Sequence, residues 1–120
     1  MELVALLSSG KGTWGQVAGL VNRGSWEKII FLCDDFFKDS VKKLDFSKKG
    51  EIITINFEKP TIEIIEEIKN KLKERIKGTE VALSIASGNG REHMAIISAL
   101  LKIPVGVKFV MLVKEGIIEL

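Results

Sequence analysis

Five short apolar runs mark the sequence, and they constrain the fold more than any other feature. They cover residues 3–7, 28–33, 51–57, 81–86 and 106–113. They do not alternate with polar residues as half-exposed strands do, and continuous apolar runs are typical of parallel strands buried on both faces. Stretches with helical spacing separate them, as in an α/β fold. We therefore expect a three-layer, Rossmann-like, mostly parallel sheet of about six strands.

The stretch from Pro60 to Lys77 has the clearest helical spacing. Lys and Glu occupy one of its faces, and apolar residues recur at three- and four-residue steps on the other: Ile62, Ile65, Ile68, Leu72 and Ile76. Further helices are expected over residues 14–22, 36–44 and 91–102. The last of these would have an apolar side of Met94, Ile97, Ala99, Leu100 and Leu101. Residues 46–50 are expected to form a loop, and residues 117–120 to return as an antiparallel strand in a C-terminal hairpin.

Composition narrows the class of protein. A chain of 120 residues suits one domain, covering residues 1–120. Its 18 Lys and Arg residues nearly balance 16 Asp and Glu, which argues against binding to long nucleic acid or to a membrane surface. No apolar run is long enough to span a bilayer, and the N-terminus lacks the basic region of a signal peptide. The single Cys33 cannot form an internal disulfide, so we expect a cytoplasmic protein with Cys33 as a buried apolar residue. The abundance of Ile, Lys and Glu is typical of thermophiles.

Two loops carry chemistry at the carboxyl ends of the expected strands, where open parallel sheets bind ligands. One covers Ser8 to Thr13 and the other Ser87 to His93. The second loop leads into a helix, whose first N–H groups favour an anion. Gly88 and Gly90 are expected to adopt positive φ angles and to let a ligand approach. Arg91 would add positive charge and His93 a group that titrates near neutral pH.

Standard nucleotide motifs fit the first loop only in part. A phosphate-binding P-loop needs a glycine five residues before Gly10, where this chain has Ala5. Gly10, Gly12 and Gly15 match the spacing of the dinucleotide fingerprint, and Asp34 and Asp35 follow the second expected strand. However, Lys11 and Trp14 lie inside that glycine pattern, and the chain has no room for a substrate domain. The same aspartates are expected to cap a helix.

No metal site or cofactor is expected. His93 is the only histidine, and neither a cluster of metal ligands nor a Ser–His–acid set has recognisable spacing. A histidine in the first turn of a helix is more often a surface or capping residue than a catalytic one. A looser role remains for the first loop, in which hydroxyl and N–H groups hold a single phosphate.

Three features together resemble a known family, the CRISPR-associated Rossmann-fold (CARF) sensor domains. The first strand ends in a Ser/Gly turn, the fourth ends in the turn "SGNGREHM", and the closing segment reads "GVKFVMLVKEGIIEL". The resemblance covers nearly the whole chain. It implies a homodimer that binds a cyclic oligoadenylate second messenger in CRISPR antiviral signalling, and some stand-alone members cleave that messenger as ring nucleases without a metal.

Carried over by position, the resemblance assigns ligand binding to two sets of residues. From the first loop these are Ser8, Ser9 and Gly10, to which the residue chemistry adds Lys11 and Thr13. From the second loop they are Ser87, Gly88, Asn89, Gly90, Arg91 and Met94. Cleavage would use Arg91, Ser9 and His93. The turn is one residue longer than the family's usual form, so either Arg91 or Glu92 can align with its basic position.

Two alternatives remain open at this stage. The chain can be a Rossmann-like protein that binds a nucleotide or dinucleotide near Gly10 to Gly15 and the Asp34–Asp35 pair. It can also be a non-catalytic regulatory subunit whose effector lies on another chain.

Overall fold

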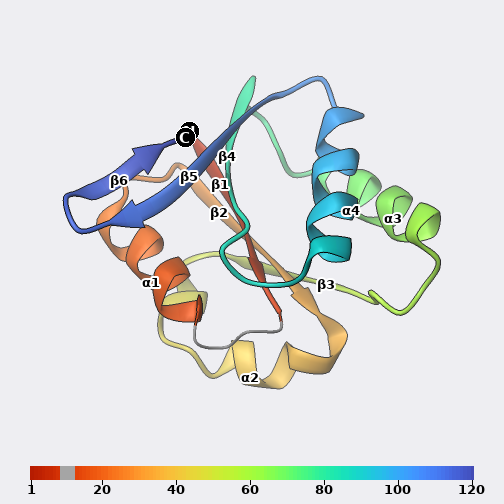
Figure 1. Cartoon of the computed structure of the whole chain (residues 1–120), viewed down its shortest axis with the longest axis horizontal. Coiled ribbons are helices and arrows are strands. Elements are labelled where there is room, and N and C mark those ends of the chain that lie inside the picture. Colours follow the sequence, from red (N-terminus) through yellow and green to blue (C-terminus); the bar gives the residue numbers. More distant parts are fainter. Residues whose placement is uncertain (9–12) are drawn as a thin grey trace.

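The structure is a computed structural model that describes residues 1–8 and 13–120. Its strands and helices alternate as expected (Figure 1). In chain order they are β1 (Glu2–Leu7), α1 (Trp14–Arg23), β2 (Lys28–Asp34), the 3-10 helix η2 (Asp35–Phe37), α2 (Lys38–Lys42), the 3-10 helix η3 (Phe46–Lys49), β3 (Glu51–Ile55), α3 (Thr61–Lys73), β4 (Glu80–Ser84), α4 (Gly90–Leu101), β5 (Gly106–Val113) and β6 (Gly116–Glu119).

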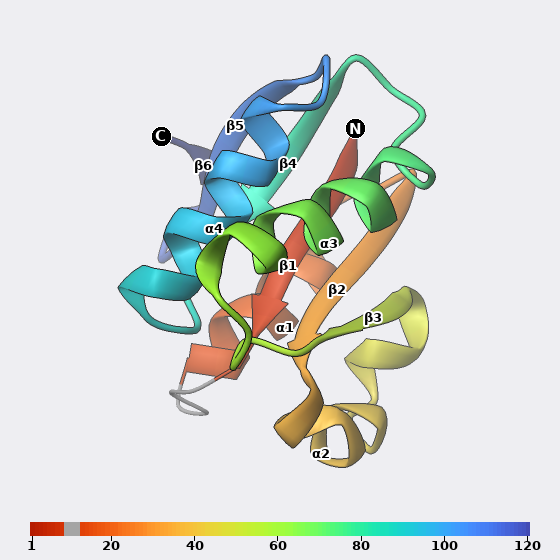
Figure 2. The same cartoon turned by 90° about the vertical axis from the view of Figure 1, so that its right-hand side faces the viewer.

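The six strands form one sheet in the order β3-β2-β1-β4-β5-β6. Neighbours from β3 to β5 run parallel, and only β5 and β6 pair antiparallel. Helices α3 and α4 lie side by side on one face, and α1 and α2 cover the other (Figures 1 and 2). The expected three-layer, mostly parallel sheet with a C-terminal hairpin is therefore confirmed.

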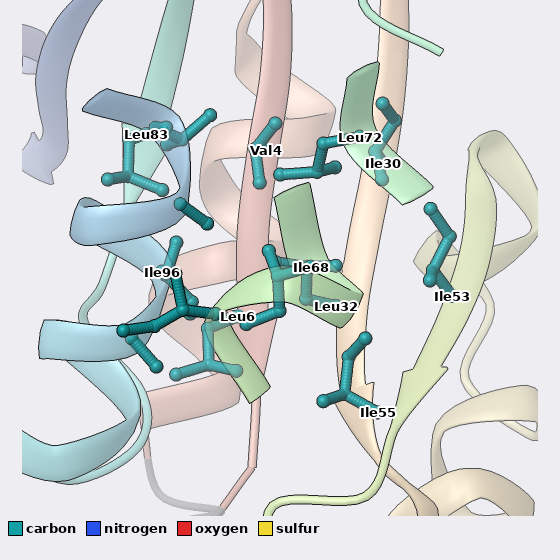
Figure 3. Close-up of a cluster of buried hydrophobic side chains, with 14 of the residues drawn as sticks. Val4, Leu6, Ile30, Leu32, Ile53, Ile55, Ile68, Leu72, Leu83 and Ile96 are labelled. Carbon is teal, nitrogen blue, oxygen red and sulfur yellow. The ribbon is translucent and has the colours of Figure 1, made fainter. Parts of the chain in front are cut away.

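The central strand β1 explains the continuous apolar runs. Val4 and Leu6 pack beneath α3 and α4, whereas Leu3, Ala5 and Leu7 pack against the α1 side, and all five are fully buried. Figure 3 shows the first of these clusters, in which side chains of four strands meet those of α3 and α4. A strand with cores on both faces has no solvent-facing side on which polar residues would alternate.

A buried glutamate fixes the amino end of β1. Glu2 is only 5% exposed, and its Oε1 accepts hydrogen bonds from the N–H groups of Lys77 at 2.9 Å and Gly78 at 2.7 Å. These groups follow the end of α3, so the carboxylate joins that end of the helix layer to the first residue of the sheet.

The helices differ from expectation in detail. Residues 36–44 do not form one helix, because Asp34 Oδ1 accepts a hydrogen bond from Phe36 N and starts η2, with a five-residue α2 after it. Residues 46–49 form a 3-10 helix instead of a loop. Helix α3 ends at Lys73, and its residue Ile62 is 72% exposed while Ile64 takes the buried position.

The exposed side of α4 also differs from expectation. Met94 and Leu101 were expected on the apolar side, but they are 67% and 74% exposed. The buried side consists of Glu92, Ala95, Ile96, Ala99 and Leu100. Every helix in the described part of the chain is too short or too polar to cross a lipid bilayer.

Candidate functional site

The carboxyl ends of β1 and β4 lie next to each other at the point where the strand order reverses. The chain leaves β1 toward α1 on one face of the sheet and leaves β4 toward α4 on the other (Figure 1). In open α/β sheets, ligands bind in the crevice at this point. The structure therefore brings Ser8 and the loop from Ser87 to His93 to one edge. Ser9, Gly10 and Lys11 lie outside the described residues, whereas Thr13 stands half-exposed before α1.

A direct bond joins the two strand ends. The N–H of Ser8 donates to Ser87 Oγ at 3.0 Å, and both side chains are 1% exposed. The carbonyl of Ser8 accepts a hydrogen bond from Trp14 Nε1 at 3.1 Å, which also connects the end of β1 to the first turn of α1. The end of β1 and the turn after β4 thus meet at Ser8 and Ser87 within one chain.

Glu92 organises the turn between β4 and α4. Its carboxylate is only 4% exposed, and Oε2 accepts a hydrogen bond from Ser8 Oγ at 2.6 Å. Its Oε1 accepts from Asn89 N at 2.9 Å, while Asn89 Oδ1 accepts from Glu92 N at 2.9 Å. This reciprocal pair is a capping box, and the helix dipole favours a carboxylate in the first turn. The network therefore locks the start of α4 onto the end of β1.

Gly88 is the residue that allows this tight turn. Its φ is +95°, and a Cβ at this position would lie 2.4 Å from Leu6 Cδ2 and 2.9 Å from Glu92 Oε1. Gly90 does not have a positive φ, and a Cβ there would meet no described atom within 4 Å. The expectation of positive φ is confirmed for Gly88 and wrong for Gly90, because Gly90 already belongs to the regular first turn of α4.

The guanidinium of Arg91 is directed toward the segment that precedes α3. Its Nη1 donates to Phe57 O and its Nη2 to Lys59 O, each at 2.5 Å, and its Nε donates to Thr61 Oγ1 at 3.2 Å. These bonds tie α4 to the start of α3. The guanidinium has five N–H donors and these bonds use three of them, so two remain that can contact a phosphate.

His93 is also held by the turn. Its Nε2 lies 2.7 Å from Ser87 O, and because a carbonyl can only accept, Nε2 carries the hydrogen. Nδ1 is then the ring nitrogen that can accept a proton or a hydrogen bond from a ligand. Met94 follows on the exposed side of α4, 67% accessible.

One polar group near this edge is unpaired. Ser84 Oγ, in the last residue of β4, is buried and has no hydrogen-bond partner among the residues that the structure describes. In residues 1–8 and 13–120, no three His, Cys, Asp or Glu side chains gather where they could hold a metal ion.

The carboxyl ends of β1 and β2 are also neighbours in the sheet. Leu7 pairs with Cys33, so Ser8 follows beside Asp34 at the carboxyl edge. Burial, and then the neighbouring carboxylates of Asp34 and Asp35, raise the pKa of the Cys33 thiol to about 12. Cys33 is fully buried, as expected, and its protonated thiol is a poor nucleophile.

Two residues of the site, Glu92 and Trp14, were not recognised in the sequence as parts of it. Asn89 followed three residues later by Glu92 is the sequence signature of a capping box, and it could have identified the buried carboxylate. Trp14 was considered only as a residue inside the glycine pattern that follows β1. Nothing in the sequence indicates that its indole N–H reaches Ser8, because that contact depends on how α1 packs on the sheet.

In comparisons with known proteins, no family model matches the chain, and no curated protein matches it.

Proposed function

We propose that this chain binds a cyclic oligoadenylate at the carboxyl edge of its sheet, between the ends of β1 and β4. The observation that carries the proposal is the hydrogen bond from Ser8 N to Ser87 Oγ at the reversal of strand order. It joins Ser8 and Ser87 at the edge where such sheets usually bind ligands, which supports the proposal. The cyclic oligoadenylate itself comes from the resemblance of these loops and of the closing hairpin to CARF domains.

The chemistry of the edge suits a phosphodiester ring. Half-exposed Thr13, N–H groups of the first turns of α1 and α4, and the Nδ1 of His93 can contact phosphates and ribose hydroxyls, whereas the hydroxyls of Ser8 and Ser87 are buried. Arg91 keeps two N–H donors beyond its bonds to Phe57, Lys59 and Thr61, so either Arg91 or Lys11 can supply the positive charge. Lys11 lies outside the described residues.

Cleavage, if it follows binding, has a defined product. The ribose 2′-hydroxyl attacks the adjacent phosphorus, the bond to the 5′-oxygen breaks, and that oxygen leaves with a proton. The products carry a 2′,3′-cyclic phosphate and a 5′-hydroxyl. Such a reaction depends on in-line placement and stabilisation of charge, and His93 Nδ1 could move a proton.

The binding test is calorimetric titration of the purified protein with cyclic tetra-adenylate and cyclic hexa-adenylate. We expect micromolar or tighter binding of one ring, weakened at least tenfold by Lys11→Gln and unchanged by Lys73→Gln at the far end of α3. Absence of binding to both rings at micromolar concentrations would refute the proposed function. Chromatography of the same mixtures after incubation separates a sensor, which leaves the ring intact, from a ring nuclease.

An uncovered apolar surface supports the homodimer that the resemblance implies. It consists of eight uncharged residues from α4, from the β5–β6 hairpin and its C-terminal end and, for Ile85, from the segment after β4: Ile85, Met94, Ile97, Leu101, Phe109, Met111, Ile118 and Leu120. We propose a second copy of this chain as its partner. The surface combines a ridge on α4 with an adjacent pocket of about 190 Å³ lined by Ile85, Phe109 and Leu120, so one copy can insert its ridge into the pocket of the other.

Two matched variants test this interface. Leu101 is 74% exposed on the surface, and Ile62 is 72% exposed on α3, outside it. Sedimentation should give a dimer for wild type and for Ile62→Glu, and a monomer for Leu101→Glu. A monomeric wild-type protein, or a Leu101→Glu variant that remains dimeric, would contradict the proposed interface.

The dinucleotide alternative has one observation against it. The third glycine of the fingerprint normally permits close packing of helix and strand. Here a Cβ on Gly15 would meet no described atom within 4 Å. Titration with NAD tests this alternative directly.

A further inference from the structure

Phe36 is the most exposed of the large apolar side chains in the described part of the chain, at 85%. It follows directly after β2, where exposure of an aromatic ring has no benefit for folding. Its backbone is nevertheless fixed, because Phe36 N donates to Asp34 Oδ1 at 2.8 Å. The exposed ring is therefore attached to a well-defined turn.

Two further aromatic rings support the ring of Phe36. Phe36 and Phe37 meet edge to face, with centroids 5.1 Å apart and planes at 87°. Phe37 meets Trp14 in the same manner, at 6.0 Å and 84°. Trp14 is 7% exposed and donates to Ser8 O. We call these three residues the aromatic ladder; it runs from the end of β1 to the solvent-exposed ring of Phe36.

The ladder stands at the edge where the proposed ligand binds. Ser8 lies between Ser87, which follows β4, and Asp34, which ends β2. Neighbouring strands are about 4.8 Å apart, so about 10 Å separates the ends of β4 and β2. Phe36 lies two residues beyond Asp34, so a nucleotide with its phosphate near the β4–α4 turn can direct its base across the end of β1, toward β2 and the turn that carries Phe36.

The charges around Phe36 favour a neutral aromatic group over an anion. Asp34 and Asp35 precede it, and exposed Lys38 and Asp39 follow shortly after, so carboxylates outnumber cations in this turn. Carboxylates repel a phosphate but do not oppose a nucleobase. The exposed apolar area is also limited to one ring between charged residues, far less than the roughly 800 Å² per partner of a protein interface. A stacked base fits both restrictions.

We infer that Phe36 is a stacking platform for a nucleobase of the ligand bound at this edge. The inference rests on the proposed function and adds a base-binding residue that the two loops do not contain. Base–aromatic stacking tolerates every base because each has a π-face, so Phe36 contributes affinity for a base and little discrimination among bases.

The test compares ligands with and without a base on three Phe36 variants and one control variant. Cyclic tetra-adenylate, cyclic hexa-adenylate, AMP and ribose 5-phosphate are titrated by calorimetry into wild type, Phe36→Ala, Phe36→Leu, Phe36→Tyr and the control Ile62→Ala. Phe36→Ala and Phe36→Leu should weaken the adenine-containing ligands about 5- to 150-fold. Phe36→Tyr should retain affinity within about threefold, and Ile62→Ala should match wild type. Ribose 5-phosphate should be unaffected by every variant.

The outcomes separate the two proposals. If wild type binds a cyclic oligoadenylate and Phe36→Ala binds it equally well, the stacking inference is overturned and the proposed function stands. If wild type binds AMP but no cyclic oligoadenylate, the proposed function fails, and the effect of Phe36→Ala on AMP decides the inference. Absence of binding to every adenine-containing ligand overturns both.

Discussion

Replacing Glu92 with alanine should destabilise the protein far more than replacing Glu63, although each glutamate is the third residue of its helix. Glu92 is 4% exposed and accepts hydrogen bonds from Ser8 Oγ and Asn89 N. Glu63, in α3, is exposed, and its helix begins at Pro60 without a side-chain cap. Both glutamates therefore interact with the dipole of their helix, but only Glu92 accepts buried hydrogen bonds from Ser8 and Asn89.

The magnitude follows from the bonds that are lost. A hydrogen bond to a carboxylate contributes about 1.5–3 kcal/mol, and Glu92→Ala removes two. It also leaves the hydroxyl of Ser8, 1% exposed, without its acceptor. After relaxation of the turn we expect a loss of about 3–5 kcal/mol, which for a chain of this length lowers Tm by about 10–20 °C. Glu63→Ala should cost at most about 1 kcal/mol, the size of the dipole interaction.

Denaturant unfolding followed by circular dichroism measures both variants. A double-mutant cycle with Ser8→Ala should give a coupling of about 1–3 kcal/mol between Ser8 and Glu92. If Glu92→Ala loses no more stability than Glu63→Ala, or if the coupling is zero, the network does not hold β1 to α4 and the reasoning fails.

Four further predictions concern single positions. Gly88→Ala should lower the free energy of unfolding by about 2–5 kcal/mol, because Gly88 has a φ of +95° and close neighbours. Gly90→Ala should be neutral or stabilising by up to about 1 kcal/mol, because a Cβ there would meet no described atom within 4 Å. Ser84→Ala should raise the unfolding free energy by about 1 kcal/mol, since its buried hydroxyl has no partner among the described residues; a loss would indicate a bonded hydroxyl. Arg91→Ala should cost about 1–2 kcal/mol in denaturant unfolding even without ligand, and an unchanged midpoint would contradict its structural role. The pKa of Cys33 is about 12 in the folded protein against 9.0 ordinarily, so the thiol of the unfolded chain loses its proton at a lower pH. The free energy of unfolding should therefore fall as pH rises above 9. Cys33→Val should abolish this component of the pH dependence.

The strands could be predicted because their apolar runs report burial directly. Residues 3–7 are all buried in the strand Glu2–Leu7, whereas the run 106–113 also forms a strand, Gly106–Val113, although only Val110 in it is buried. The strand order places the ends of β1 and β4 next to each other, which brings Ser8 beside Ser87. Sheets of this kind usually bind ligands at this point. This part of the candidate site needed only the pattern of the chain.

The orientation of individual side chains could not be predicted in the same manner. Isoleucines at positions 62, 64 and 65 permit two apolar faces on α3, and only packing on the sheet selects Ile64 over Ile62. Arg91 bonds to carbonyls of residues 57 and 59, which approach α4 only because α3 packs beside it. The contact between Glu92 and Ser8 spans 84 residues, although its local half, the capping box, was readable from the sequence.

The two buried glutamates determine which parts of the molecule should unfold last. Glu2 attaches the first residue of β1 to the end of α3, and Glu92 attaches the residue after β1 to the start of α4. β1, α3 and α4 should therefore open as one cooperative unit, with the slowest amide hydrogen exchange in the chain. The β5–β6 hairpin, covered on one face only, should exchange first. A ligand seated between β1 and β4 would then bind to the most rigid part of the protein, whereas any partner on the hairpin would order its most labile part.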